Sequence, residues 1–254
     1  MAVKDIVPEL MDAIRTDYGL RLADSPELAD IAERIAKGAA VLADGHELAV
    51  VRGELLSETL QSIITPSALP DGRMYFNIAN RTVRPMLTDN YVAINEAAAL
   101  IQRALDEQDG IGLSPVRPEF AESRVAGLVN KLSDDGVATE AALKFLGEPI
   151  VNCSEAFFDD YIQANAAART RAGMTVRLER RLGSSEMRAY RAGRRTRTYH
   201  VPCPYCQNLA GTYEFSTLSE ASYLFARHES CRCVITYTNS KNPSASITRQ
   251  LWQR

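Results

Sequence analysis

The sequence predicts an α+β protein in which a mostly helical N-terminal region precedes a small β-containing zinc-knuckle module. Apolar residues recur at helical spacing through the first 150 residues, whereas strand-like alternation is confined to the last third of the chain. Four of the five cysteines fall between Cys203 and Cys233. We therefore divide the chain into a helical region at 1–149, an α+β zinc-binding module at 150–238 and an extended C-terminal tail at 239–254.

The helices of the first region are marked by apolar stripes and by capping residues. Ile6, Leu10 and Ile14 lie about one helical turn apart, and Ser25, followed by a proline and a glutamate, is a typical helix start. Further helices are expected over 28–35, 45–64, 94–105, 120–132 and 139–146. Residues 88–90 (Thr-Asp-Asn) are expected to cap the helix that begins near Ile94.

The chain changes character after Gly147. Ser154 is expected to cap a helix that ends before Gly173, a glycine well placed for a helix C-terminus. Strands are expected over 175–182, 194–201 and 231–238. The loop 110–118, with two glycines and two prolines, is interpreted as a hinge between subdomains.

Arginines concentrate just before the cysteine segment. Between Ala166 and His200 there are ten arginines and only two acidic residues, although the whole chain has a net charge of −3. This imbalance predicts contact with a polyanion or with an acidic protein surface; a solvated surface hairpin is the alternative. The candidate contact residues are Arg188, Arg191, Arg194, Arg195 and Arg197.

The tail carries the single tryptophan of the chain, Trp252. The tail is polar apart from Ile247, Leu251 and Trp252, so it offers too little apolar surface to fold by itself. We expect the indole of Trp252 to be buried at a contact with a neighbouring subunit; docking on its own domain is the alternative.

The clustered cysteines have the spacing of a metal site. Cys203 and Cys206 form a CxxC turn whose thiolates can both reach one ion at about 2.3 Å. His228, Cys231 and Cys233 follow as three candidates for the two remaining positions. The pattern predicts one structural Zn²⁺ per chain, with buried reduced cysteines as the alternative. A redox CxxC is disfavoured because no thioredoxin-like βαβ pattern surrounds it.

Catalytic motifs are missing, so no catalytic residue is predicted and the chain is not expected to be an enzyme. Residues 202–206 match the PCxxC half of the zinc nucleobase deaminases, but neither His46 nor His200 begins the His-x-Glu that this reaction requires. A site with four or more sulfur and nitrogen ligands also leaves no position for water. The acid pairs at 134–135 and 159–160 are interpreted as solvated surface.

Neither secretion nor membrane insertion is indicated. The first residues lack the basic and apolar segments of a signal peptide, and apolar runs such as 97–101 are far shorter than the roughly 18 residues that a membrane span needs. We expect folding in a cytoplasm and no membrane partner.

The cysteine segment resembles a known family. The runs from Cys203 to Tyr213 and from Arg227 to Tyr237 are similar to the C-terminal segment of minor capsid proteins of tailed bacteriophages, the Mu F-like head morphogenesis family, in which CxxC is followed by HxxCxC. Residues 151–173 resemble the helix that precedes this segment. The resemblance covers roughly 151–252, and the first 150 residues share only a helical character.

The resemblance implies a virion component made in the host cytoplasm and located at the capsid interior or portal vertex. Its partners would be the phage portal or major capsid protein, with double-stranded DNA as a further candidate. Its role would lie in head assembly and in DNA packaging or ejection. The alternative is a zinc-stabilised nucleic-acid-binding regulator whose segment 177–197 grips phosphates. A zinc-dependent hydrolase or deaminase is disfavoured for the reasons given above.

Overall fold

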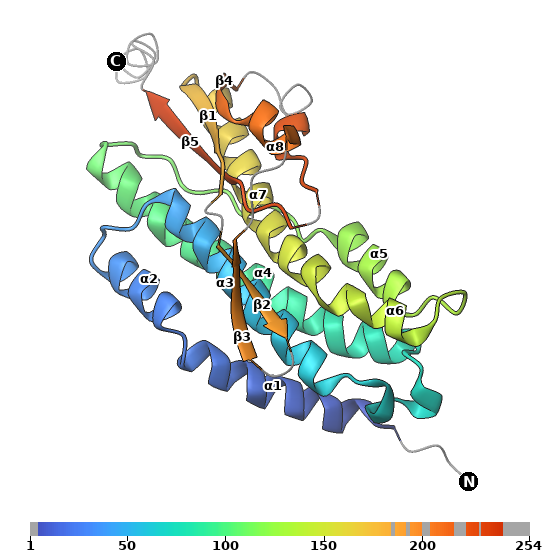
Figure 1. The fold of residues 1–254 in the computed structure, drawn as a ribbon. Helices are drawn as coiled ribbons and strands as arrows, with labels where there is room; N and C mark the ends of the chain where they lie inside the picture. The colour runs from blue at the N-terminus through green and yellow to red at the C-terminus, as the bar shows by residue number, and fades with distance from the viewer. Residues whose placement is uncertain are drawn as a thin grey trace, which may run out of the picture.

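The computed structural model describes residues 5–183, 204–215, 222–228 and 230–240, together with the backbone of residues 186–191 and 194–199. Within these ranges the protein is mostly helical, with a small three-stranded antiparallel sheet near its C-terminus (Figure 1). The predicted order, with helices first and strands last, is confirmed. Among the helices described, none combines the length and apolar character needed to cross a membrane.

The helices form a bundle around α3. Helix α3 contacts α1, α2, α4 and α7, and the long helices run along the length of the molecule (Figure 1). The helices are α1 (Val7–Ala23), α2 (Pro26–Ala36), α3 (Leu42–Ile63), α4 (Phe76–Gln108), α5 (Glu122–Leu132), α6 (Thr139–Leu143), α7 (Glu148–Arg171) and α8 (Pro204–Leu209), with short 3₁₀ turns η1 (Pro66–Ala68), η2 (Pro70–Gly72), η3 (Lys144–Leu146) and η4 (Ser222–Phe225). Ser25 caps α2 as predicted, since its hydroxyl accepts a hydrogen bond from the Leu28 amide at 3.3 Å.

The sheet has the strand order β4-β1-β5, with β1 (Thr175–Arg181) antiparallel to both β4 (Gly211–Glu214) and β5 (Val234–Ser240). A separate hairpin consists of β2 (Glu186–Arg191) and β3 (Arg194–Tyr199). The predicted strands correspond to β1, β3 and β5, whereas β2 and β4 were not anticipated. Because β5 begins after the cysteines, the expectation that Cys231 and Cys233 open this strand is wrong.

The hydrophobic core is continuous from the first helix to the last strand. Phe157, Phe158 and Tyr161 of α7 are fully buried within it. Val176 of β1 and Tyr237 of β5 belong to the same cluster as the apolar side chains of α1, α3 and α4. The residues on either side of the boundary drawn at 149 therefore share one core.

A buried polar network explains two capping predictions that are wrong. Helix α4 runs unbroken through Asn90, and α7 begins at Glu148, well before Ser154. Asn90 accepts hydrogen bonds from the Tyr18 hydroxyl at 2.5 Å and from Arg52 Nε at 3.2 Å, and it donates to the Ser154 hydroxyl at 3.2 Å. These polar side chains thus join α1, α3, α4 and α7 to one another in the interior.

The loop 110–118 is hydrogen-bonded to helices of the bundle, which argues against the predicted hinge. The Asn165 side chain of α7 makes two hydrogen bonds of 2.8 Å with the backbone N–H and C=O of Val116. The Tyr91 hydroxyl of α4 donates to the Pro118 carbonyl at 2.5 Å. Movement of this loop would break bonds to two core helices.

Two glycines let α3 and α7 approach closely. A Cβ atom built on Gly53 would lie 2.9 Å from Val151 Cα and 3.0 Å from Ser154 Cβ. One built on Gly45 would lie 2.6 Å from the Phe158 ring. Glycine ordinarily weakens a helix interior relative to alanine, so its presence here reflects the tight contact between the two helices.

We predict that Gly53→Ala lowers the free energy of unfolding by about 1–3 kcal/mol, because the added methyl group meets backbone that cannot move aside. Gly127→Ala is the matched control, since nothing lies within 4 Å of a Cβ at that helical position. Chemical denaturation measures both. The Gly127 variant should be as stable as the wild type or slightly more stable, because alanine favours a helix more than glycine does. The explanation would be wrong if the Gly53 variant were as stable as this control.

Candidate metal centre

Three cysteine and histidine side chains meet beside the sheet. Cys206 lies on the short helix α8, and His228 and Cys231 stand at the two ends of a turn. In this turn the Cys231 amide donates to the His228 carbonyl at 3.2 Å, and Ser230 adopts a left-handed backbone with φ of 62°. The ligand atoms of Cys206, His228 and Cys231 all lie within 4.8 Å of one another, so the group could hold a metal ion.

The spacing of the donor atoms suits a tetrahedral ion. The sulfurs of Cys206 and Cys231 are 3.7 Å apart. Bonds of about 2.3 Å at a tetrahedral angle require roughly 3.8 Å between two thiolate sulfurs. The Cys206 sulfur and His228 Nε2 are closer, at 2.9 Å, so this pair would open by about half an ångström to accept an ion.

Cys233 lies at the edge of the three-residue group. It is buried in one cluster with Cys206 and Cys231. The hydrogen bond from Cys231, opposed by burial, lowers the pKa of Cys233 to about 7, while the pKa of Cys231 is raised. Of the five predicted ligands, Cys206, His228 and Cys231 are thus brought together as a possible metal site. Cys233 is buried beside the two cysteines, and Cys203 lies outside the described residues.

Two arginines face the Cys231 sulfur. Arg180 of β1 approaches it with Nη2 at 3.7 Å, and Arg227 approaches it with Nη1 at 3.9 Å. Guanidinium groups stabilise a thiolate relative to a thiol, because they place positive charge beside the sulfur. Arg227 thus lowers the pKa of Cys231, but the hydrogen bond with Cys233 and burial outweigh this effect, so the pKa of Cys231 is raised.

In the segment from Arg227 to Cys233, metal-ligand candidates alternate with arginines that bind carboxylates of the bundle. Arg227 makes a bidentate ion pair with Asp159 of α7, at 2.5 and 2.9 Å, and also reaches Glu155 at 3.5 Å. Arg232 lies next to two cysteines and pairs with carboxylates of α3 and α7. Its partners are Glu148 at 2.6 Å, Glu155 at 3.4 Å and Glu54 at 3.7 Å.

Glu155 interacts with both of these arginines, Arg227 and Arg232, and its side chain has no exposed surface. Burial alone would raise its pKa, but Arg227, a hydrogen bond with His46 and Arg232 together lower it. Glu54 behaves differently. The pKa of Glu54 is raised to about 7, because burial and three nearby glutamates together outweigh the opposing effect of Arg232.

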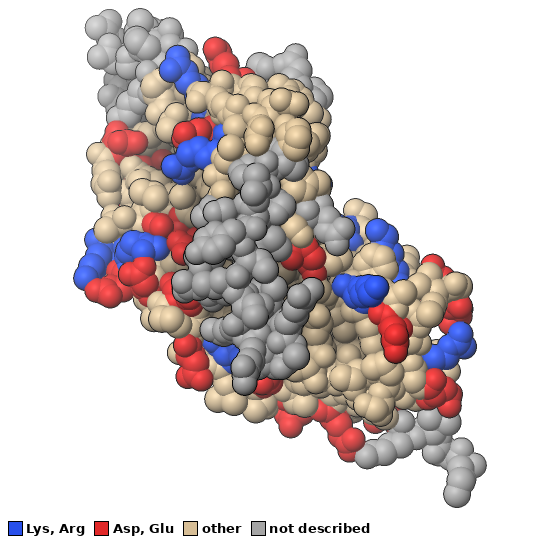
Figure 2. Space-filling view, viewed as in Figure 1, with Lys and Arg blue, Asp and Glu red and all other residues tan. Residues whose placement is uncertain are grey.

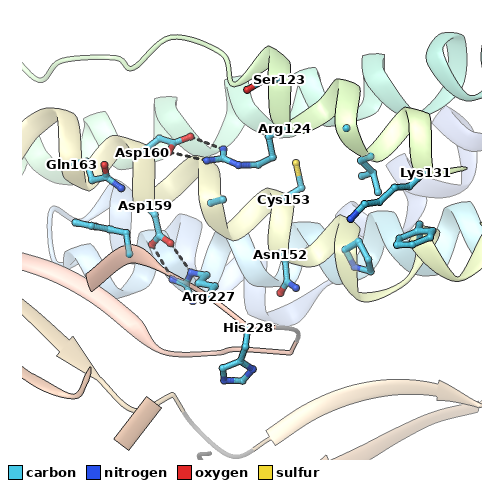
Figure 3. Close-up of a pocket in the computed structure, with 16 residues that line it drawn as sticks. Ser123, Arg124, Lys131, Asn152, Cys153, Asp159, Asp160, Gln163, Arg227 and His228 are labelled. Carbon is cyan, nitrogen blue, oxygen red and sulfur yellow. Dashed lines mark hydrogen bonds and ion pairs between the residues drawn. The ribbon is translucent and has the colours of Figure 1, made fainter. Parts of the chain in front are cut away.

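A pocket of about 640 Å³ lies between α5, α7 and the segment 225–228, with His228 on its rim (Figure 3). Its carboxylates are occupied: Asp160 accepts two hydrogen bonds from Arg124, and Asp159 accepts two from Arg227. Asp159 is also buried, so its interpretation as solvated surface is wrong. Burial raises the pKa of the Cys153 thiol in this pocket to about 12, so it stays protonated and unreactive.

Two other predicted sites are not tested by the described side chains. Trp252 lies outside the described residues, and the hairpin arginines are described by their backbone alone. The hairpin register places Arg188 opposite Arg197 and Arg191 opposite Arg194. On the face shown in Figure 2, described acidic and basic residues are interspersed, without a broad patch of one sign.

The residues that support the site were not predicted from the sequence. Arg180 lies two residues after the buried Leu178 and four after the buried Val176. Alternate residues of a strand face the same side, so this spacing indicated that Arg180 points inward. Arg227 and Arg232 each lie directly beside a ligand candidate. Their carboxylate partners on α3 and α7 carry no comparable local signal, because they are brought close only by the packing of the helices.

We predict that Asp159→Asn lowers the free energy of unfolding by about 3 kcal/mol, since it leaves Arg227 buried without its main counterion. The neighbouring variant Asp160→Asn is the control, because it breaks the equivalent but more exposed pair with Arg124 and should cost about 0–1 kcal/mol. Denaturation curves compare the two. Equal losses would show that burial of the Asp159 pair does not matter.

A second prediction concerns pH. The folded-state pKa of Glu54, about 7, lies above its ordinary value of 4.5, so the folded protein binds an extra proton between these values and becomes less stable as pH rises. Glu54→Gln should therefore raise the unfolding free energy at pH 8 and change it little at pH 5. The control is Glu47→Gln, an exposed position on the same helix. An effect of Glu54→Gln that is the same at both pH values would contradict this assignment.

Comparison with known proteins adds no relative. No protein family, no curated protein and no solved structure matches the chain. The function is therefore argued from the residues of this chain and from their arrangement.

Proposed function

We propose that the chain is a structural minor head protein of a tailed bacteriophage. In this role it docks on the portal or major capsid protein at the capsid interior and acts in head assembly and in DNA packaging or ejection. One Zn²⁺ per chain holds its C-terminal module together, since thiolate and imidazole ligands together favour zinc.

The observation that carries the proposal is the pattern CxxC followed by Arg-His-x-x-Cys-Arg-Cys, which resembles the Mu F-like head morphogenesis proteins. Three of its residues, Cys206, His228 and Cys231, gather into one group that could hold a metal ion, and its two arginines bind carboxylates of the bundle. This use of the motif suits a rigid docking module.

A non-enzymatic role is favoured by the chemistry around the cluster. Cys206, Cys231 and Cys233 are almost completely buried, and with the His228 imidazole they can fill a tetrahedral shell without leaving a place for water. In the adjoining pocket both aspartates are held by arginines, and the Cys153 thiol stays protonated. These groups lack the freedom that a general base or a nucleophile needs.

The runner-up is a zinc-stabilised nucleic-acid-binding regulator. The observation in its favour is the hairpin register, because like charges directly opposite one another destabilise a strand pair unless an anion lies between them. A regulator that grips phosphates with Arg188, Arg195 and Arg197 would bind free duplex DNA with a steep dependence on salt. A minor head protein instead requires binding to a portal or capsid protein.

The test is mass spectrometry of purified particles of the phage that encodes the chain, combined with elemental analysis of the isolated protein. The expected result is that the chain is a stable particle component, in far fewer copies than the major capsid protein, and that it holds about one zinc per chain. Replacing Cys206 with Ser should abolish zinc binding and remove the chain from particles.

The control is Cys153→Ser, which removes a buried cysteine of α7 that lies away from the cluster and should leave the zinc content unchanged. The capsid role would be refuted if the chain were absent from purified particles and instead remained on DNA in the host cytoplasm. That result would favour the regulator.

A further inference from the structure

Arg180 is a buried arginine without a carboxylate partner among the described residues. Only 1% of its surface is exposed, and it ranks with Arg169 as one of the largest fully buried side chains. Arg169 pairs with Asp106, and Arg227 and Arg232 pair with the carboxylates of α3 and α7. Arg180 therefore needs a different source of negative charge.

The contacts of Arg180 point to the metal centre. Its Nη1 donates to the backbone carbonyls of Leu224 and Ala226, the latter at 3.0 Å, and its Nη2 donates to the Cys231 sulfur at 3.7 Å. Carbonyl oxygens satisfy N–H groups but carry no net charge. Among the described atoms that accept hydrogen bonds from this guanidinium, the Cys231 sulfur is the one that can become an anion.

The charge of a metal site depends on how many thiolates it contains. A divalent ion with two thiolates is neutral, whereas three thiolates give the centre a net charge of −1. A buried guanidinium is strongly unfavourable unless a negative charge compensates it. A neutral two-thiolate centre would leave Arg180 uncompensated, and a three-thiolate centre would balance it.

We infer that the metal centre contains at least three thiolates and that Arg180 is its built-in counterion. The inference rests on the proposed metal site and specifies its composition. Cys206 and Cys231 supply two of the thiolates, and Cys233, which is buried in one cluster with both, supplies the third. His228 can then complete the tetrahedral shell.

Arg227 does not fill this role, although it also approaches Cys231. Its charge is taken up by the bidentate pair with Asp159 and by Glu155. Arg180 is thus a positioning residue of the metal centre: it holds Cys231 through the sulfur and fixes the η4 turn through two carbonyls. Residues in such outer contacts commonly change metal affinity about 10–100-fold when they are replaced.

The experiment titrates the purified full-length protein with Co²⁺ and follows the sulfur-to-cobalt charge-transfer absorbance, which grows with each bound thiolate. The wild-type protein is expected to show at least three thiolates. Arg180→Met should lower Co²⁺ affinity about 10–100-fold and reduce the number of bound thiolates. Arg180→Lys keeps the positive charge, so it should retain the thiolate number with a smaller loss of affinity.

The matched control is Arg181→Met, which removes a neighbouring arginine whose side chain is 53% exposed and lies near Glu179. It should bind Co²⁺ like the wild type. A purely structural role for Arg180 would lower the melting temperature of Arg180→Met without changing the affinity or the thiolate number, and this result would overturn the inference.

The wild-type spectrum alone keeps the inference testable if Arg180→Met fails to fold. A wild-type centre with two thiolates would refute the inference and leave the metal site itself intact. Failure to bind any Co²⁺ would refute the metal site on which the inference depends. Neither result would bear on whether the chain is found in purified particles.

Discussion

The arrangement of the C-terminal third depends on a buried ionic interaction between two arginines and the carboxylates of the helical bundle. Glu155, which is fully buried on α7, receives both Arg227 and Arg232. Because these arginines alternate with His228 and Cys231 along the chain, the ligand candidates are held at a fixed distance from the bundle. The position of the group formed by Cys206, His228 and Cys231 is therefore set by the electrostatics of α3 and α7.

This interaction links the candidate metal ligands to the helix packing. Helix α7 carries Glu155 on one turn and contacts α3 through Gly53 close by, so the spacing of the two helices also sets the spacing of the carboxylates that receive Arg232. The sheet contributes from the other side, where Arg180 of β1 reaches the Cys231 sulfur. The cluster thus lies where the bundle and the sheet meet.

Much of the fold could be predicted from the sequence, because helical stripes, strand alternation and the cysteine spacing are local patterns. The predictions failed where a polar residue serves a distant partner. Asn90 and Ser154 were predicted to be helix caps, yet both lie inside helices and are hydrogen-bonded to each other across the core. Asp159 read as solvated because its partner, Arg227, is 68 residues away in the sequence. No local pattern reveals such pairs.

The distance along the chain between Glu155 and Arg232 also affects the order of events during synthesis. These partners are separated by 77 residues. At ordinary rates of translation, Arg232 is added roughly 4–15 s after Glu155. For that interval the acidic residues of α3 and α7 exist without the arginines that neutralise them. The ion pairs of Glu155 with Arg227 and Arg232 can therefore form only when almost the whole described chain has been made.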